Sequence, residues 1–359
     1  MRTNYSRKNR SRPARYLTSG AILAVTVMLC ASGTNAATKK AKTSRTKPKT
    51  ATTVVPKASA TAIPLALIGY ALPKSVGGID LTKLPLGDSR VSLTAASVGG
   101  IWACRIDPNA GGARVVGPWI NVTAGTFDYT AKYIVDGDVS WAASSYTSSV
   151  QGDRRVFASN DLPKHTTGNF PIAATDDAYQ IDRNPWPIGA QSLSFSVPAS
   201  PTENASPNCT PGEVGITLDG VMILDALDAP GRDAVAHETQ DHCDGHPNQA
   251  GYHYHNLSRC ITENADGSGR HVGWILDGFP LMSRMENGKV VTNKDLDECH
   301  GHIGNITIDG KAVTTYHYHA TYEFPYTVGC MKGTPTRLPR TGAPAGAPGL
   351  GGPPATPKP

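Results

Sequence analysis

The first 79 residues contain no aspartate or glutamate, and the first carboxylate of the chain is Asp80. Thirteen of the 34 Lys and Arg residues lie in positions 1–57, so from residue 58 onward 21 basic residues face 29 acidic ones, a net charge of −8. The overall charge of +5 therefore comes from the N-terminal segment. Because phosphate binding needs clustered Lys and Arg on the folded domain itself, we expect no nucleic-acid partner.

The sequence also lacks an apolar run of the about 20 residues that a helix needs to cross a bilayer. Its most apolar segment, 21–31, follows a cationic stretch at 1–16 and precedes small residues at 34–36 that fit a signal-peptidase site. We therefore expect a signal peptide at 1–36, with a single membrane anchor as the alternative. Once the signal is removed no transmembrane span should remain, and the protein should be secreted or placed in the periplasm or cell envelope.

Long helical periods are missing too. Charged residues make up only 18%, whereas Gly and Pro are frequent, at 37 and 28 residues, and short apolar or alternating runs at 131–135 and 191–197 are typical of strands. We expect a mainly β fold, a single β-rich domain with few short helices. The Lys/Thr-rich stretch 37–60 should be a disordered linker, 61–335 the β-rich body, and the Pro/Gly-rich stretch 336–359 a disordered tail.

Complete hydrolytic motifs are absent. There is no Gly-x-Ser-x-Gly and no phosphate-binding loop, and His237 and His242 are five residues apart, so on a regular helix they diverge by about 140° and cannot share a metal ion. Free cysteines are not expected either, because an even number of cysteines remains after the signal peptide and export favours disulfides. The six remaining cysteines are Cys104, Cys209, Cys243, Cys260, Cys299 and Cys330.

An internal repeat occupies the C-terminal part of the body. Cys-x-Gly-His at 243–246 and 299–302 is followed by Tyr-His-Tyr-His at 252–255 and 316–319, and each copy ends in a further cysteine. Asp-Gly pairs at 219–220, 277–278 and 309–310 lie between apolar runs and predict hairpins. The simplest disulfide pairing is within the copies, Cys243 with Cys260 and Cys299 with Cys330, leaving Cys104 with Cys209. Pairing between the copies fits the spacing equally well.

Ten of the eleven histidines lie in 237–319. In a strand, residues i and i+2 face the same side, so Tyr-His-Tyr-His places two imidazoles together, and a third can come from the preceding Cys-x-Gly-His loop. We therefore predict a transition-metal ion, zinc or copper, on one or both of two sets. The predicted ligands are His246, His253 and His255 in the first copy and His302, His317 and His319 in the second. We expect Asp241, Asp297 and His242 to support them from outside the ligand set.

The quoted stretches resemble the YHYH-domain proteins, an exported family named for this motif. The resemblance rests on 212–220, 243–255, 273–280, 296–302 and 316–330, and it extends over about 155–335. It includes 159–168, similar to the opening segment of the family, which implies His165 as a further site residue. The resemblance implies export and brings no assigned reaction.

Three functional hypotheses follow. The first is a metal-binding protein, either a metal-dependent hydrolase or a copper redox protein. The second is a non-catalytic, disulfide-stabilised surface or binding module whose His and Tyr pairs are structural. The third is a domain that binds or cleaves polysaccharide or takes another small-molecule ligand. It is suggested by the five tryptophans, Trp102, Trp119, Trp141, Trp186 and Trp274.

Overall fold

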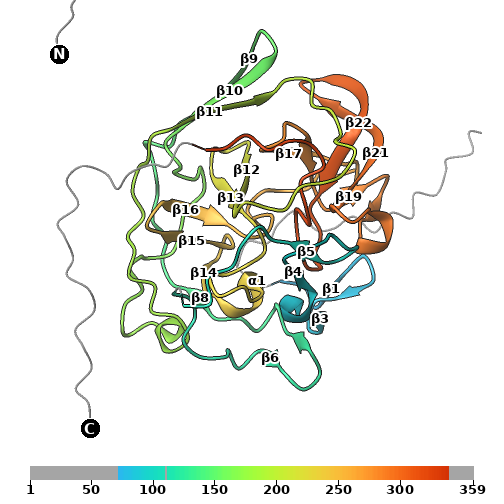
Figure 1. The fold of residues 1–359 in the computed structure, drawn as a ribbon. Helices are drawn as coiled ribbons and strands as arrows, with labels where there is room; N and C mark the ends of the chain where they lie inside the picture. Colours follow the sequence, from blue (N-terminus) through green and yellow to red (C-terminus); the bar gives the residue numbers. More distant parts are fainter. Residues whose placement is uncertain (1–71, 110, 339–359) are drawn as a thin grey trace, which may run out of the picture. The chain divides into compact units, whose positions relative to one another are not determined.

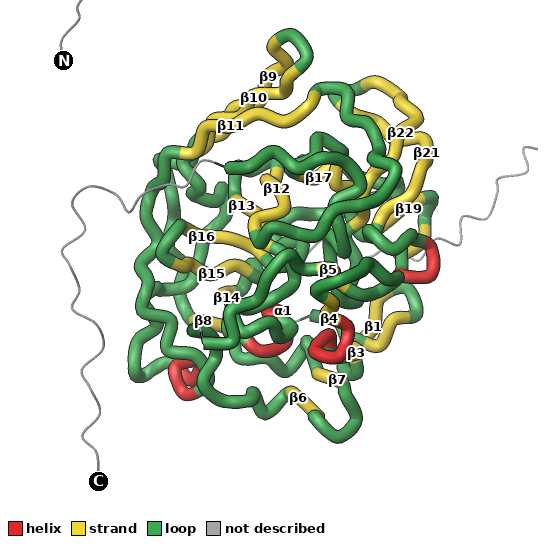
Figure 2. Tube along the Cα trace, in the orientation of Figure 1, coloured by secondary structure: helices red, strands yellow, loops and turns green. Residues whose placement is uncertain are grey.

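Short strands joined by turns and loops make up most of the computed structural model, which describes residues 72–109 and 111–338 (Figure 2). The described residues contain one α-helix and three 3-10 turns, so the prediction of a mainly β fold with few short helices is confirmed. These elements are α1 (Ala234–His237), η1 (Gly87–Arg90), η2 (Asp177–Gln180) and η3 (Asn293–Asp295). The expected signal peptide and linker, and all but the first three residues of the expected tail, lie outside the described residues.

An eight-stranded sheet holds both copies of the repeat (Figure 1). Its strand order is β15-β16-β13-β12-β17-β18-β22-β21. The bounds are β12 (Glu213–Thr217), β13 (Met222–Leu224), β15 (Gly245–Asn248), β16 (Gly251–Tyr254), β17 (His271–Ile275), β18 (Pro280–Met282), β21 (Gly301–Ile308) and β22 (Lys311–His319).

The order of this sheet reads as two matching halves that meet at the antiparallel pair β12–β17. In each half a hairpin comes first, β12–β13 or β17–β18. The Tyr-His-Tyr-His strand then adds in parallel beside the second strand of that hairpin, as β16 beside β13 or β22 beside β18. The Cys-x-Gly-His strand closes the edge as β15 or β21. The repeat therefore begins at β12, some thirty residues before the first Cys-x-Gly-His.

The three Asp-Gly turns connect antiparallel neighbours, as the sequence predicts: β12–β13, β17–β18 and β21–β22. Gly220 and Gly278 have φ values of +95° and +94°, a conformation that favours glycine. The third turn has Asp309 at +51° and Gly310 at +74°, so both central residues are left-handed, as in a type I′ hairpin.

Smaller sheets surround the main one. The three-stranded sheet β11-β10-β9 consists of Leu193–Pro198, Arg154–Ser159 and Tyr146–Gln151, so the strand expected at 191–197 is present as β11. The other three-stranded sheet, β3-β7-β6, consists of Leu84–Pro85, Thr126–Phe127 and Ile120–Asn121. Four two-stranded pairs complete the fold: β1 (Ser75–Val76) with β2 (Ile79–Asp80), β4 (Val91–Ser92) with β5 (Ile101–Trp102), β8 (Ile134–Val135) with β14 (Gln240–Asp241), and β19 (Met285–Glu286) with β20 (Lys289–Val290).

Two apolar cores support these elements. One lies on the main sheet and joins strands of both halves, with Ile216, Ile275 and Leu281 fully buried. The other gathers the N-terminal strands around α1 and the segment 324–326. All described residues fall within one compact unit. Thr336, in the first part of the expected tail, donates its N–H to the carbonyl of Leu276. Among the described helices, none has the length and apolar character that a bilayer crossing requires.

Candidate metal centres

The three histidines of the first copy converge on one point. His246 on β15 lies opposite His253 on β16, and His255 follows two residues later, so all three rings are on the same face. The ring centroids are 4.5, 5.0 and 5.3 Å apart, and one nitrogen of each ring lies within 4.8 Å of the others. We call this group, together with Glu238, centre 1.

The second copy repeats the arrangement. His302 on β21 lies opposite His317 on β22, with His319 two residues further along. The ring centroids are 4.6 to 5.0 Å apart, and the Nε2 atoms of His302 and His317 are separated by 3.0 Å. Glu286 joins the group, and all four donor atoms lie within 4.8 Å of one another. This group is centre 2.

Backbone carbonyls fix the orientation of the rings. The Nδ1 of His255 lies 2.6 Å from the carbonyl oxygen of Asp225, and the Nδ1 of His319 lies 2.9 Å from that of Ser283. Since a carbonyl accepts only from a protonated nitrogen, Nδ1 carries the proton and Nε2 presents a lone pair to the centre. Asp225 and Ser283 occupy the same place in the repeat, directly after β13 and β18. Such bonds are typical of imidazoles that bind metal ions.

His253 and His317 are held in the same way from within their own strands. Their Nδ1 atoms face the carbonyl oxygens of Gly251 and Thr315, two residues earlier, at 3.2 and 3.1 Å. The Nδ1 of His302 faces the carbonyl oxygen of Asp295 at 3.2 Å. Five of the six predicted ligands therefore have Nδ1 bonded to the main chain, which leaves Nε2 to face the centre.

A glutamate that no sequence motif indicates lies beside the histidines of each centre. The Oε2 of Glu238 lies 3.5 Å from Nε2 of His246 and 3.4 Å from Nε2 of His255. Glu286 lies 3.4, 3.6 and 3.9 Å from the Nε2 atoms of His302, His317 and His319. Glu238 stands eight residues before the first histidine of its centre and Glu286 sixteen before its own, so aligning the two copies does not pair them.

Burial favours the neutral form of four of the six ligand imidazoles. It lowers the pKa of His253 to about 3 and that of His255 to about 4, with the His255 ring adding to the effect on His253. It also lowers the pKa of His246 well below its usual range, and that of His317 to about 4. Neutral imidazole is the form that binds zinc, copper, iron or nickel.

Centre 1 contains buried polar atoms with no hydrogen-bond partner among the described residues. They are both ring nitrogens of His246 and the Oε2 of Glu238. In centre 2 the corresponding atom is the Nε2 of His319. Leaving such groups unpaired costs about 1–3 kcal/mol each, and a cation placed between Nε2 of His246 and Oε2 of Glu238 would satisfy these two atoms together. The donor sets therefore fit a transition-metal ion.

Residues 194–293 match the family described as YHYH protein. The chain carries a YHYH domain. The matched residues include all of centre 1 and Glu286, and they end before the three histidines of centre 2. No curated protein and no solved structure matches the chain.

The two centres of the YHYH-domain protein are separate sites. Strand β16, which carries His253 and leads into His255, and strand β22, which carries His317 and His319, are five strand spacings apart in the main sheet. At the usual spacing of about 4.8 Å this places the centres roughly 24 Å apart. Figure 1 shows β15–β16 and β21–β22 at opposite ends of the sheet.

The structure places Asp241 and Asp297 on the Cys-x-Gly turns. The Asp241 carboxylate accepts from the N–H of Cys243 and from the hydroxyl of Tyr252, at 2.8 Å each. The Asp297 carboxylate accepts from the N–H of Cys299 and the hydroxyl of Tyr316, at 2.9 Å each. These contacts hold the turn and the neighbouring strand together, so the support reaches the ligands through the backbone.

His165 and His242 lie outside both centres. The Nε2 of His165 is 2.5 Å from the hydroxyl oxygen of Tyr254, and the Nε2 of His242 is 3.2 Å from the hydroxyl oxygen of Thr166. His165 is also close to the sulfurs of Cys243 and Cys260. Those sulfurs form a disulfide and are not thiolates, so this third group lacks the donors that a metal ion needs.

Three disulfides connect the six cysteines: Cys104–Cys209, Cys243–Cys260 and Cys299–Cys330. This is the within-copy pairing, and it places one disulfide behind each Cys-x-Gly-His turn. The tryptophans do not gather into a binding surface. Trp119 and Trp274 are buried in different cores, whereas Trp186 is 37% exposed.

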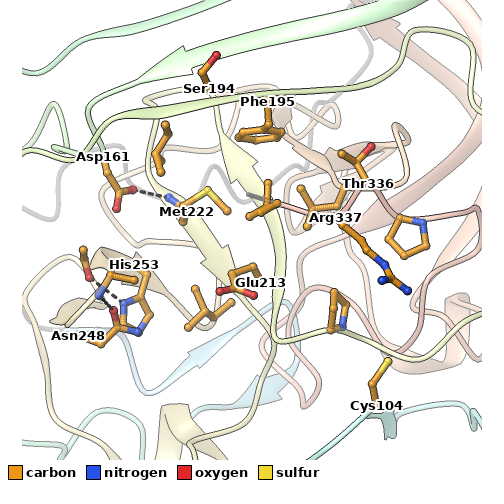
Figure 3. A pocket seen from close by; sticks show the side chains of 18 of the residues that line it. Cys104, Asp161, Ser194, Phe195, Glu213, Met222, Asn248, His253, Thr336 and Arg337 are labelled. Carbon is orange, nitrogen blue, oxygen red and sulfur yellow. Dashed lines mark hydrogen bonds between the residues drawn. The ribbon is translucent and has the colours of Figure 1, made fainter. Parts of the chain in front are cut away.

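A pocket of about 960 Å³ lies beside centre 1 (Figure 3). His253 forms part of its wall, together with Asp161, Phe195, Met222 and Glu213. The other members of centre 1 do not line it. The Nδ1 of His253 is bonded to the carbonyl of Gly251, which also lines the pocket.

Proposed function

We propose that this YHYH-domain protein binds two transition-metal ions, one in each centre, and acts outside the cytoplasm. The proposal rests on one observation: in five of the six ligand imidazoles, Nδ1 is hydrogen-bonded to a main-chain carbonyl. These bonds direct the Nε2 atoms of each centre toward one point beside a glutamate. The same arrangement occurs twice on a duplicated half-sheet.

The donor chemistry supports zinc or copper. Imidazole nitrogen with one carboxylate suits zinc, copper, iron and nickel, whereas magnesium and calcium prefer sets made of oxygen atoms. Thiolate ligands do not enter, because all six cysteines of the described residues are in disulfides. Zinc would support hydrolysis of a substrate, and copper would support electron transfer.

The three disulfides support export, because such bonds persist in the periplasm, the cell envelope and the exterior. The apolar segment 21–31 within the expected signal peptide is the route that we propose for export. A small-molecule or polysaccharide ligand would have to reach a centre from solution.

Metal content after mild purification tests the proposal. We expect two equivalents in the wild-type protein and one in each of the variants His253→Ala and His317→Ala, since each substitution removes one ligand of one centre. His165→Ala is the matched control, a histidine outside both centres, and should keep two equivalents. Unchanged metal content in both ligand variants would reject the proposal.

A non-catalytic, disulfide-stabilised binding module is the second candidate. The hydrogen bonds of the four buried tyrosines favour it, because Tyr252, Tyr254, Tyr316 and Tyr318 each bond a carboxylate and can hold the strands in place without an ion. This candidate predicts no stoichiometric metal in the wild-type protein and a large loss of stability in His253→Ala and His317→Ala.

A further inference from the structure

The two centres differ in how far solvent reaches their ligands. The side chains of His302 and Glu286 in centre 2 are 27% and 22% exposed. In centre 1 the side chains of His246 and His255 are each 4% exposed and that of Glu238 is 12% exposed. The same ligand types therefore form one closed site and one site that solvent reaches from the side of His302 and Glu286, while His317 and His319 stay buried.

The edge strands explain this difference. β15 is buried along its first three residues, because β14 pairs with β8 beside it and the connecting segments cover it. β21 is the opposite edge of the sheet, and its residues 302–305 alternate between half-buried and exposed positions before the buried Ile306. Ile303, directly after His302, is 64% exposed. Centre 2 thus lies at an edge that the described residues leave uncovered.

The two glutamates are also held differently. Glu238 follows α1, and the Lys132 ammonium donates to the carbonyls of Val235 and Glu238 and to the side chain of Gln240, so the segment is fixed on both sides of the carboxylate. Glu286 ends the two-residue strand β19, next to a turn in which Asn287 and Gly288 both have positive φ. A carboxylate on a short exposed hairpin can leave an ion more easily than one fixed beside a buried helix.

The unpaired buried atoms also distinguish the two centres. Of the unpaired atoms that one ion could bind, centre 1 has two, Nε2 of His246 and Oε2 of Glu238, and centre 2 has one, Nε2 of His319. Without an ion, centre 1 keeps more polar groups out of contact with a partner, so the fold depends on its ion more strongly.

We infer that the two centres have different roles: centre 1 retains its ion as a structural site, and centre 2 exchanges its ion and accepts a small anionic ligand from solution. This inference rests on the proposed binding of metal at both centres. It assigns any reaction of a dissolved substrate to centre 2. In the closed centre 1 the four protein donors leave no path by which another ligand can reach the ion, whereas the exposed side of centre 2 leaves such a path.

Release of zinc to EDTA, followed with a chromogenic indicator, tests the exchange. In the zinc-loaded full chain we expect two phases of one equivalent each, the faster at least tenfold faster than the slower. His317→Ala should keep only the slow phase and His253→Ala only the fast one. A single phase for both equivalents, or a fast phase that survives in His317→Ala, would overturn the inference. The number of release phases in the wild-type protein tests the inference even where a variant fails to fold.

Azide titration of the cobalt-loaded chain tests ligand access. We expect azide to change the visible absorption of cobalt in the wild-type protein and in His253→Ala, and to leave His317→Ala unchanged. A response in His317→Ala equal to that of the wild type would overturn the inference. Failure of the proposed function is distinct from either outcome, because the wild-type protein would then retain no zinc after desalting.

Discussion

Residues 213–255 and 271–319 build the same half-sheet twice, but only one of the two resulting centres is closed to solvent. Three features occur in both halves: the facing histidines, the tyrosines on the other face of the sheet and the carbonyls that bind Nδ1. Strand register and local backbone hydrogen bonds determine all three. What differs comes from the connecting segments, which supply Glu238 in one half and Glu286 in the other.

This difference teaches that a duplicated strand unit fixes the imidazole ligands but leaves the carboxylate and the cover free to diverge. The segment between β13 and β15 carries α1 and leaves its glutamate 12% exposed, whereas the segment between β18 and β21 forms the β19–β20 hairpin and leaves its glutamate 22% exposed. The two halves can therefore be compared position by position, and each difference in their surroundings predicts a measurable difference.

The largest expected effect concerns the disulfides. Cys299–Cys330 closes a separation of 31 residues and Cys243–Cys260 one of 17. Replacing both cysteines by alanine should lower the free energy of unfolding by about 4 kcal/mol in the second copy and about 3 kcal/mol in the first, because the longer loop restricts the unfolded chain more. Urea unfolding measures both values. A larger loss in the first copy would show that the copies differ in more than loop length.

The next effect compares the first residues of β12 and β17. Glu213 is exposed, whereas its counterpart His271 packs against Trp274 and its Nε2 donates to the carbonyl of Gly273. Burial lowers the pKa of His271 from 6.5 to about 4. The contribution of this shift to the free energy of unfolding is fully present above pH 6.5. It is lost as the pH falls from 6.5 through 4, because the unfolded chain binds the proton at a higher pH than the folded protein does.

His271→Gln should reduce the decrease in the free energy of unfolding between pH 6.5 and pH 4 by on the order of 3 kcal/mol. Urea unfolding at several pH values measures the slope. Lys311→Gln, on an exposed strand end, is the control and should keep the wild-type slope. An unchanged slope in His271→Gln would mean that this histidine does not titrate in the folded protein as its burial requires.

Much of this comparison was available in the sequence, because it depends on local patterns. Alternation along Tyr-His-Tyr-His predicted which histidines meet, and three Asp-Gly pairs predicted three hairpins. The earlier part of the repeat was also legible: Val-Gly-x-x-Leu-Asp-Gly occurs at 214–220 and again at 272–278. Reading those stretches as one unit would have predicted the two matching halves of the sheet.

The rest depends on contacts between distant segments. Glu238 and Glu286 occupy unequal positions in the two connecting segments, so neither spacing nor repeat alignment identifies them. Asp241 and Asp297 do stand beside the cysteine turns, but their carboxylates bond the backbone N–H groups of those turns and the tyrosines of the neighbouring strands, not the ligand histidines. The separation of the centres follows from strand order, which no short motif records.

The smallest effect compares the last tyrosine of each Tyr-His-Tyr-His. The hydroxyl of Tyr318 donates to Asp277 at 2.6 Å and accepts from the N–H of Lys332 at 2.7 Å, and Asp277 is 1% exposed. Tyr318→Phe should therefore cost about 2 kcal/mol of unfolding free energy, because it leaves a buried carboxylate and a backbone N–H each short of one partner.

The equivalent hydroxyl of Tyr254 faces His165 at 2.5 Å and Asp219 at 3.4 Å, and both of these are half-buried and can turn to water. Tyr254→Phe should cost about 1 kcal/mol, half the effect of Tyr318→Phe. Urea unfolding of the two variants under the same conditions gives the difference directly, and metal content should stay at two equivalents in both, because the tyrosines face away from the ions. The two copies differ in the solvent exposure of the groups that bond the tyrosine hydroxyl. Equal costs for the two variants would show that this exposure does not determine how much the hydroxyl contributes to stability.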